Sequence, residues 1–251
     1  MLHSFKFKTL LEERKPLIGL IQTLDSLSVT EILSAVGFDW LFLDLEHSAM
    51  DVLDAQRLVQ AAGSACPYVI RIPCHEETWI KKSLDTGAAG IIVPRVNTAE
   101  EAAAIIRFSK YPPEGCRSVG YSRAHGFGAS FGEYVKNANR DIAVILQIED
   151  IKAVRNIESI VKVPGIDALF IGPYDLSGSM GKIGQVKDPD VQREIETVRR
   201  VCQNAGMPTG IFTSDPTDVK ALIDNGFTLI AAGIDTAYFN QSLNQALSIM
   251  K

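Results

Sequence analysis

"KKSLDTGAAGIIVPRV", residues 81–96, joins the end of a helical pattern to an apolar strand through Gly87. The same order of helical pattern, glycine and apolar run repeats along the chain, and it is typical of parallel βαβ units. The expected strands lie at 17–22, 39–45, 68–72, 89–96, 142–149, 167–172, 208–212 and 228–233. The expected helices lie at 27–36, 51–62, 76–86, 98–109, 150–160, 190–205, 215–225 and 234–249.

Eight strand–helix units in a chain of 251 residues favour a (β/α)8 barrel over an open doubly wound sheet. An open sheet usually has fewer strands and often a phosphate-binding loop, but no G-x-G-x-x-G or Walker motif follows an expected strand. Helix starts are also marked, because Thr98 and Glu101 have capping-box spacing and Asp215 precedes Pro216. We therefore predict one (β/α)8 barrel domain over residues 1–251.

The composition restricts the class of protein. Hydrophobic residues make up 46% of the chain and charged residues 22%, which is an ordinary globular balance. The net charge of −5, without a long basic run, argues against nucleic acid as a partner. No membrane-spanning run or signal-peptide pattern is found, and the four cysteines form no C-x-x-C pair. We expect a reduced, cytoplasmic protein without a structural zinc site.

Residues 111–140 form the one long stretch without a clear strand or helix pattern. Loops of this length in a compact domain are usually functional or disordered. Because this stretch connects a helix to the next strand, we expect much of it to start on the lower face of the barrel. Arg117 and Arg123 in this stretch are either ligands for an anionic substrate tail or solvated loop arginines.

Several expected strands end in polar residues, and the carboxyl ends of barrel strands carry the active site. Asp44, Glu46 and His47 cluster at the end of strand 39–45. Arg71 lies at the end of the third strand, where its permanent charge needs an anion or carbonyl partner. The fifth strand ends with Gln147 and Glu149, whose spacing of two places both side chains on one face. Asp175 follows the sixth strand.

Glu149 and Asp175 follow neighbouring strands, which lie about 4.8 Å apart in a barrel, so they can hold one ion between them. Two carboxylates without a nearby His or Cys pair suit a hard ion such as Mg²⁺, Mn²⁺ or Co²⁺. Two protein ligands leave positions open for water or substrate, as in catalytic metal sites. These residues favour a metal-assisted enzyme.

Each of these residues also has a structural interpretation. Glu149 could cap the following helix, and Asp175 could be a turn residue. Arg71 could pair with a structural carboxylate, and His47 could be a hydrogen-bonded loop histidine. Coincidence at all of these strand ends is a weaker explanation than a shared site.

The motifs together resemble the HpcH/HpaI aldolase family. They occur in family order and cover residues from about 17 to 235: "GFDWLFLDLEHS", "RIP", "GAAGIIVPRVNTAEEA", "PPEGCRSVGYSRA", "LQIED" and "FIGPYDLSGSMG". The resemblance implies a class II pyruvate aldolase on a (β/α)8 barrel. Such enzymes cleave a 4-hydroxy-2-oxo acid to pyruvate and an aldehyde, and they run the reverse condensation without an organic cofactor.

The resemblance also assigns roles to individual residues. Glu149 and Asp175 match the metal ligands, and His47 matches the acid–base residue. Arg71 matches the residue that contacts the 2-keto oxygen. The remaining substrate-binding positions are Gln147, Tyr174, Asp175 and Phe212. Backbone N–H groups near Tyr174 and Asp175 are expected to meet the pyruvate carboxylate.

Asp85 matches an aspartate that pairs with the catalytic histidine. As the last residue of a helix before the fourth strand, Asp85 is expected on the lower face, whereas His47 is expected on the upper face. The pairing therefore requires a neighbouring subunit, and the resemblance implies a homo-oligomer, specifically a hexamer. A solvated helix-end acid is the alternative for Asp85.

Two positions depart from the family pattern. Ile21 stands where many members have tryptophan, and Tyr174 stands where many have alanine. A tyrosine beside a metal ligand is expected to reshape the aldehyde pocket. The competing functions are a CoA-thioester lyase similar to the citrate lyase β-subunit and a non-catalytic, degenerate barrel.

Overall fold

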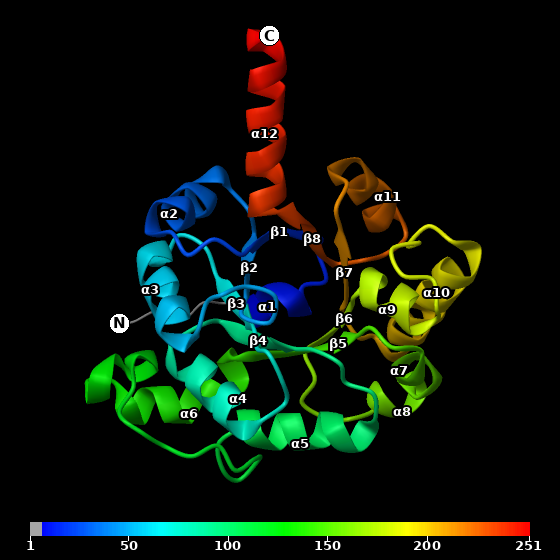
Figure 1. Cartoon of the computed structure of the whole chain (residues 1–251). Coiled ribbons are helices and arrows are strands. Elements are labelled where there is room, and N and C mark those ends of the chain that lie inside the picture. Colours follow the sequence, from blue (N-terminus) through cyan, green and yellow to red (C-terminus); the bar gives the residue numbers. More distant parts are fainter. Residues whose placement is uncertain (1–6) are drawn as a thin grey trace.

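The computed structural model describes residues 7–251, in which eight parallel strands pair in chain order and β8 closes the barrel against β1 (Figure 1). The predicted (β/α)8 barrel is therefore confirmed. Every expected apolar run forms its strand, with small differences at the ends. The strands are β1 (Leu17–Gln22), β2 (Trp40–Asp44), β3 (Tyr68–Arg71), β4 (Gly90–Val93), β5 (Ala143–Ile148), β6 (Ala168–Ile171), β7 (Thr209–Thr213) and β8 (Leu229–Ile234).

The expected helices also form. They are α2 (Leu27–Val36), α3 (Val52–Ala62), α4 (Glu77–Asp85), α5 (Ala99–Ser109), α7 (Ile151–Arg155), α8 (Ile157–Ile160), α10 (Pro189–Ala205), α11 (Val219–Asp224) and α12 (Asp235–Met250). Thr98 and Glu101 make the predicted capping box at α5. Asp215 caps a 3₁₀ turn, η2 (Pro216–Asp218), which leads into α11. No helix within residues 7–251 is long and apolar enough to cross a membrane.

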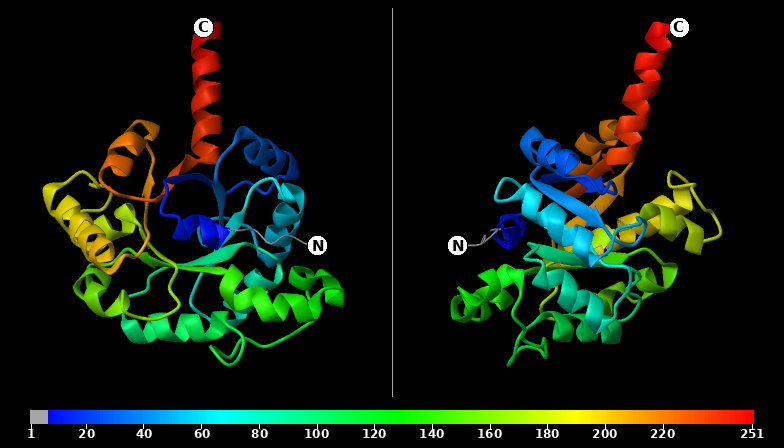
Figure 2. Two further views of the ribbon diagram at one scale, coloured as in Figure 1. Left: turned by 180° about the vertical axis from the view of Figure 1, so that it is seen from behind. Right: turned by 60° about the vertical axis from the view of Figure 1, so that its left-hand side comes forward.

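Helix α1 (Phe7–Glu12) was not predicted and closes one end of the barrel. Phe7 and Leu11 are buried with Trp40, and the Phe7 and Trp40 rings lie 5.9 Å apart. The left view of Figure 2 shows the molecule from behind, with α1 across the end of the barrel that faces away from the viewer in Figure 1. Side chains therefore fill the barrel interior at the end covered by α1. The opposite end is the one available for a functional site.

The irregular stretch after α5 contains the short helix η1 (Arg123–Gly128) and α6 (Phe131–Asp141). Helix α6 contacts α1, and η1 contacts α4, so this segment packs around the closed end of the barrel. The predicted placement on the lower face agrees with these contacts. Helix α6 was not predicted, and within it only Ala138 is fully buried.

Helix α12 forms where it was expected but projects away from the barrel between α2 and α11 (Figures 1 and 2). Its direction is anchored at its first residue, because Asp235 accepts hydrogen bonds from the backbone N–H groups of Thr23 and Leu24 and from Thr23 Oγ1. Phe239, Leu243 and Leu247 are about half exposed or more, at 63%, 54% and 47%. Spaced by four residues, they form an apolar stripe along one face of the helix.

Candidate active site

The open end of the barrel collects the polar side chains from the carboxyl ends of the strands. Phe42, Val69, Ile145 and Phe170 point into the barrel core. Because side chains alternate along a strand, the residues two positions later also point inward at the mouth of the barrel. Those residues are Asp44, Arg71, Gln147 and Gly172. The alternation explains why these residues share one layer.

Asp44 and Arg71 form a buried, bidentate ion pair at the ends of β2 and β3. Arg71 Nε donates to Asp44 Oδ1 at 2.9 Å, and Nη2 donates to Oδ2 at 2.6 Å. Asp44 is 2% exposed and Arg71 is 8% exposed. The pair leaves Arg71 Nη1 as the nitrogen that Asp44 does not use. The guanidinium therefore has both a structural carboxylate partner and a donor for a ligand.

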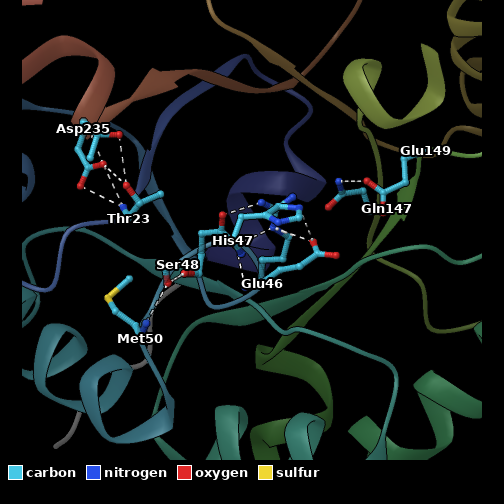
Figure 3. Close-up of polar contacts among 11 residues, drawn as sticks. Thr23, Glu46, His47, Ser48, Met50, Gln147, Glu149 and Asp235 are labelled. Atoms are coloured by element: carbon cyan, nitrogen blue, oxygen red, sulfur yellow. Dashed lines mark hydrogen bonds and ion pairs between the residues drawn. The ribbon is translucent and has the colours of Figure 1, made fainter. Parts of the chain in front are cut away.

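Glu46 and His47 are positioned by the same aspartate. Asp44 Oδ1 accepts hydrogen bonds from the backbone N–H groups of Glu46 and His47 at 3.0 and 3.3 Å. Glu46 Oε2 lies 3.3 Å from Arg71 Nε and 3.7 Å from His47 Nε2. The His47 side chain is 59% exposed, at the rim of the barrel mouth (Figure 3). His47 is thus accessible to a substrate or to another protein chain.

Glu149 is held as a buried carboxylate and does not cap a helix. Its Oε1 accepts from the Arg95 N–H at 2.7 Å, and its Oε2 accepts from Gln147 Nε2 (Figure 3). The capping alternative is wrong, because Asp150 caps α7. Burial, followed by repulsion from the Glu46 carboxylate, raises the pKa of Glu149 to about 7. Asp175 lies in the first turn of α9 (Pro173–Ser179), which directly follows β6, the strand paired with β5.

The donors around Glu149 fit a hard cation. Gln147 Oε1 is buried and has no hydrogen-bond partner within residues 7–251. The Glu149 and Asp175 carboxylates are all-oxygen donors of the kind that Mg²⁺ and Mn²⁺ prefer. No group of three His, Cys, Asp or Glu side chains in the described part of the chain could hold a metal ion. A metal between Glu149 and Asp175 would therefore take its other ligands from water or substrate.

Tyr174 and Phe212 form the opposite wall of the mouth. Tyr174 lies in α9 (Pro173–Ser179), which follows β6, and its ring centroid is 6.0 Å from that of Phe212. The Tyr174 and Ser214 hydroxyl groups are hydrogen-bonded at 3.0 Å. A groove of about 930 Å³ begins at these residues and continues between α10 and α11. This wall is the part of the site with room for a variable portion of a ligand.

Asp85 does not meet His47 within the chain. It ends α4, and its Oδ1 accepts from Arg117 Nη2 at 2.7 Å. Arg117 and Arg123 are only 2% and 6% exposed, so the expectation of solvated loop arginines is wrong. Arg123 Nη1 donates to the carbonyl oxygen of Thr86 at 2.6 Å. Both arginines bind the end of α4, so neither faces the barrel mouth as a ligand for a substrate tail.

Three contributors to the site were missed in the sequence or were given no role. Asp44 orients Arg71, and Arg95 donates its backbone N–H to Glu149 with a positive φ of 55°. Gly172 leaves room for both Glu149 and Gln147, because a Cβ there would lie 2.7 Å from Glu149 Oε2. Inward alternation from Phe42 could have identified Asp44, whereas no local pattern identifies Arg95.

Comparison with known proteins identifies the family. The HpcH/HpaI aldolase/citrate lyase family matches residues 18–242. The chain belongs to this family. A hydroxypyruvate/pyruvate aldolase of Paraburkholderia phytofirmans is 38% identical, covering 96% of this chain and 95% of that protein. A 5-keto-4-deoxy-D-glucarate aldolase of Klebsiella pneumoniae is 34% identical, covering 98% and 96%.

Solved structures of the HpcH/HpaI family have the same fold. A family member from Burkholderia cenocepacia has a TM-score of 0.93 at 34% identity, covering 97% of this chain and 98% of that one. A citrate lyase β subunit from M. tuberculosis, described in complex with oxaloacetate and magnesium, has a TM-score of 0.58 at 15% identity over 91% and 95%. The latter likeness shows the fold alone. The predicted family and the predicted aldolase class of carbon–carbon lyase are confirmed by these relatives.

Replacing Gly172 by alanine tests the geometry of this aldolase site. The new Cβ would lie 2.7 Å from Glu149 Oε2 and 2.9 Å from Gln147 Nε2, so the two side chains must move. We expect aldolase kcat/KM to fall about 10²-fold, the effect of a roughly 1 Å misplacement of reacting groups. Gly178→Ala is the matched control, since its Cβ would come no closer than 3.8 Å to Ile183. Equal activity of both folded variants would contradict this role of Gly172.

Proposed function

We propose that this protein is a divalent-metal-dependent class II aldolase that cleaves a 4-hydroxy-2-oxo acid to pyruvate and an aldehyde, and that it catalyses the reverse condensation. The observation that carries this proposal is the buried Glu149 carboxylate at the end of β5, with Asp175 in the first helical turn after the neighbouring β6. When bound there, a divalent metal would act as a Lewis acid toward the 2-oxo group of the substrate. Mg²⁺, Mn²⁺ and Co²⁺ all suit these ligands.

Arg71 and His47 supply the remaining chemistry. As the C3–C4 bond breaks, His47 takes the proton of the 4-hydroxyl group, and the electron pair of that bond moves toward the 2-oxo oxygen. Arg71 Nη1, kept in place by the Asp44 pair, stabilises the negative charge on that oxygen. A proton delivered to C3 then completes pyruvate. The aldehyde leaves toward the open wall at Tyr174 and Phe212.

The pyruvate carboxylate has a binding position at the start of α9. The N–H groups of Tyr174 and Asp175 belong to the first turn, where helical N–H groups have no partner within the helix. Pro173, the first residue of the helix, has no N–H group to contribute. Gln147 donates its amide N–H to Glu149, and its Oε1, unpaired within residues 7–251, is left to accept a hydrogen bond from the substrate or a bound water. These groups orient the substrate without a covalent bond to the protein.

Metal removal tests the proposed reaction. We expect a chelator to abolish pyruvate formation from a 4-hydroxy-2-oxo acid, and Mg²⁺, Mn²⁺ or Co²⁺ to restore it. Glu149→Gln and Asp175→Asn keep the size of each side chain but remove a charged ligand. The affinity of both variants for the metal, measured by calorimetry, should therefore be lower. Asp150→Asn, which changes only the cap of α7, is the matched control. Full activity in the presence of chelator would refute the class II assignment.

Tyr174 is proposed to select the aldehyde. Its ring packs on Phe212 and its hydroxyl group bonds Ser214, where the groove between α10 and α11 begins. Tyr174 therefore stands at the end of the groove that lies next to Asp175, its neighbour in α9. Phe212 contributes apolar surface at the same end of the groove.

Tyr174→Ala should widen this end of the groove. The relative kcat/KM values across a panel of short and long aldehydes should then change by about tenfold or more, within the range that pocket contacts usually give. Pyruvate enolisation, measured by exchange of its methyl protons with solvent, should survive. Tyr174→Phe keeps the ring and loses only the bond to Ser214, so it separates ring size from hydrogen bonding. An unchanged aldehyde preference in Tyr174→Ala would contradict this role.

The projecting helix α12 supports the proposal of a homo-oligomer. With 16 residues, it extends about 24 Å from its anchor at Asp235. Its apolar stripe is matched by exposed apolar residues on the neighbouring α2, where Leu27, Ile32 and Val36 are 52%, 61% and 66% exposed. Reciprocal exchange of α12 between two copies would cover both surfaces, as in domain swapping. Hexameric assembly is part of the same proposal.

Acidic substitutions in the stripe test this assembly. Leu243→Glu with Leu247→Glu should lower the mass measured by light scattering after gel filtration, because burying two carboxylates at an apolar contact is costly. Gln241→Glu with Gln245→Glu adds the same charge away from the stripe and should leave the mass unchanged. If both pairs have the mass of the unmodified protein, α12 does not mediate assembly.

We also propose that Asp85 serves His47 of a second copy. Asp85 cannot reach His47 of its own barrel, whereas both side chains are partly exposed, at 27% and 59%. The segment that contacts the end of α4 carries exposed apolar residues, since Arg123 of η1 binds Thr86 and the same segment contains the exposed Tyr121 and Phe127. An apolar surface with one carboxylate suits contact with another copy that presents a histidine.

A further inference from the structure

Arg117 is a buried arginine with an unusual set of contacts. Its side chain is fully buried, and its guanidinium carbon lies 4.6 Å from the centre of the Tyr111 ring and 5.9 Å from that of Tyr134. Only Nη2 has hydrogen-bond partners, Asp85 Oδ1 at 2.7 Å and the Tyr134 hydroxyl at 3.4 Å. Nε and Nη1 are buried without a hydrogen-bond partner within residues 7–251. Desolvating a guanidinium in this way is costly.

Packing alone does not account for that cost. The Tyr111 and Tyr134 rings make cation–π contacts with the guanidinium, which are modest in strength, whereas replacing buried charges by apolar residues of similar volume is often neutral or stabilising. The one carboxylate that pairs with Arg117 among the described residues is that of Asp85. The role of Arg117 is therefore to be sought in what it does to that carboxylate.

The backbone around Arg117 fixes its position. The Arg117 N–H donates to the Lys110 carbonyl oxygen at 2.9 Å, and the Cys116 N–H donates to the Arg107 carbonyl oxygen at 2.7 Å. The turn closes tightly on the end of α5, because a Cβ at Gly115 would lie 2.3 Å from the Lys110 carbonyl oxygen. The planar guanidinium is then clamped by the two tyrosine rings. Arg117 thus holds one oxygen of Asp85 in a defined place.

We propose that Arg117 is a positioning residue of the active site, which holds Asp85 Oδ1 so that Oδ2 is presented to His47 of a second copy. This inference rests on the proposed sharing of the site between copies. Arg117 belongs to the interior of one subunit, yet its effect is exerted in the site of the neighbouring subunit. Loss of Arg117 should therefore impair the site that uses Asp85 of the same subunit, and not the site that contains His47 of that subunit.

Mixing subunits that carry different substitutions tests whether Arg117 acts on the site of the neighbouring subunit. The reference arm mixes His47→Ala with Asp85→Ala subunits under conditions of verified exchange. Activity should recover, because some hybrid sites contain an intact His47 from one subunit and an intact Asp85 from the other. No recovery in this arm would refute the shared site itself, and with it the inference about Arg117.

The test arms use Arg117→Met, which keeps the packing length and removes the charge. Its kcat should fall about 10²-fold, as expected for a misplaced catalytic contact. Mixing it with His47→Ala should restore activity, because hybrid sites then combine an intact His47 with an intact Arg117–Asp85 pair. Mixing it with Asp85→Ala should restore none, since both variants lack a functional Asp85. A subunit that had merely lost stability would not show this selectivity.

Lys110→Met is the matched control. Lys110 is a second buried cation of the same segment, and its Nζ donates to the carbonyl oxygens of Asn139 and Ile142 and not to Asp85. Its kcat should remain within about twofold of the unmodified enzyme. If Arg117→Met does not fold, Arg117→Lys keeps a charge without the planar fork, and the same mixing pattern is expected from it. Near-normal kcat in the folded Arg117 variants, or no recovery with His47→Ala while the reference arm recovers, would overturn the inference.

Discussion

The buried ion pair between Asp44 and Arg71 organises the active-site end of the barrel. Its two residues are directly paired in the register of β2 and β3, so the strands themselves bring the charges together. The Asp44 carboxylate also accepts hydrogen bonds from the N–H groups of Glu46 and His47. It therefore positions both His47, the acid–base candidate, and the Arg71 guanidinium. Removing one partner from such a buried pair typically costs about 3–5 kcal/mol. The site geometry and part of the stability therefore depend on one contact.

Most of the fold could be predicted, because its signals are local and repeated. The run 81–96 is representative: Asp85 ends α4, Gly87 has a positive φ of 83°, and β4 follows at Gly90. Each unit repeats this order, and eight units leave few topologies other than a closed barrel. Helices α1 and α6 were missed because they are held by contacts with distant parts of the chain. Phe7, for example, packs on Trp40 inside the barrel.

The candidate site was predictable where it depends on strand periodicity. Asp44, Arg71 and Gln147 occupy the inward positions at the strand ends, and Glu149 follows two residues after Gln147. The sequence did not show which residue donates to each buried carboxylate. Arg117 is 32 residues from Asp85 along the chain, and Arg95 reaches Glu149 through its backbone, so neither contact has a local pattern. The direction of α12 also depends on a distant contact, that between Asp235 and Thr23.

Two separate surfaces of the barrel are proposed as contacts with other copies of the chain. The α12 stripe and the exposed face of α2 lie beside the outer wall, whereas Asp85 and η1 lie around the end of α4. Exchange of α12 is reciprocal and would join copies in pairs by a twofold axis. The proposed contact of Asp85 with His47 joins the end of α4 in one copy to the barrel mouth of another, so it is a second kind of interface. A hexamer built on twofold and threefold axes requires two kinds of interface, and the proposed α12 exchange and the proposed contact of Asp85 with His47 would supply one of each kind.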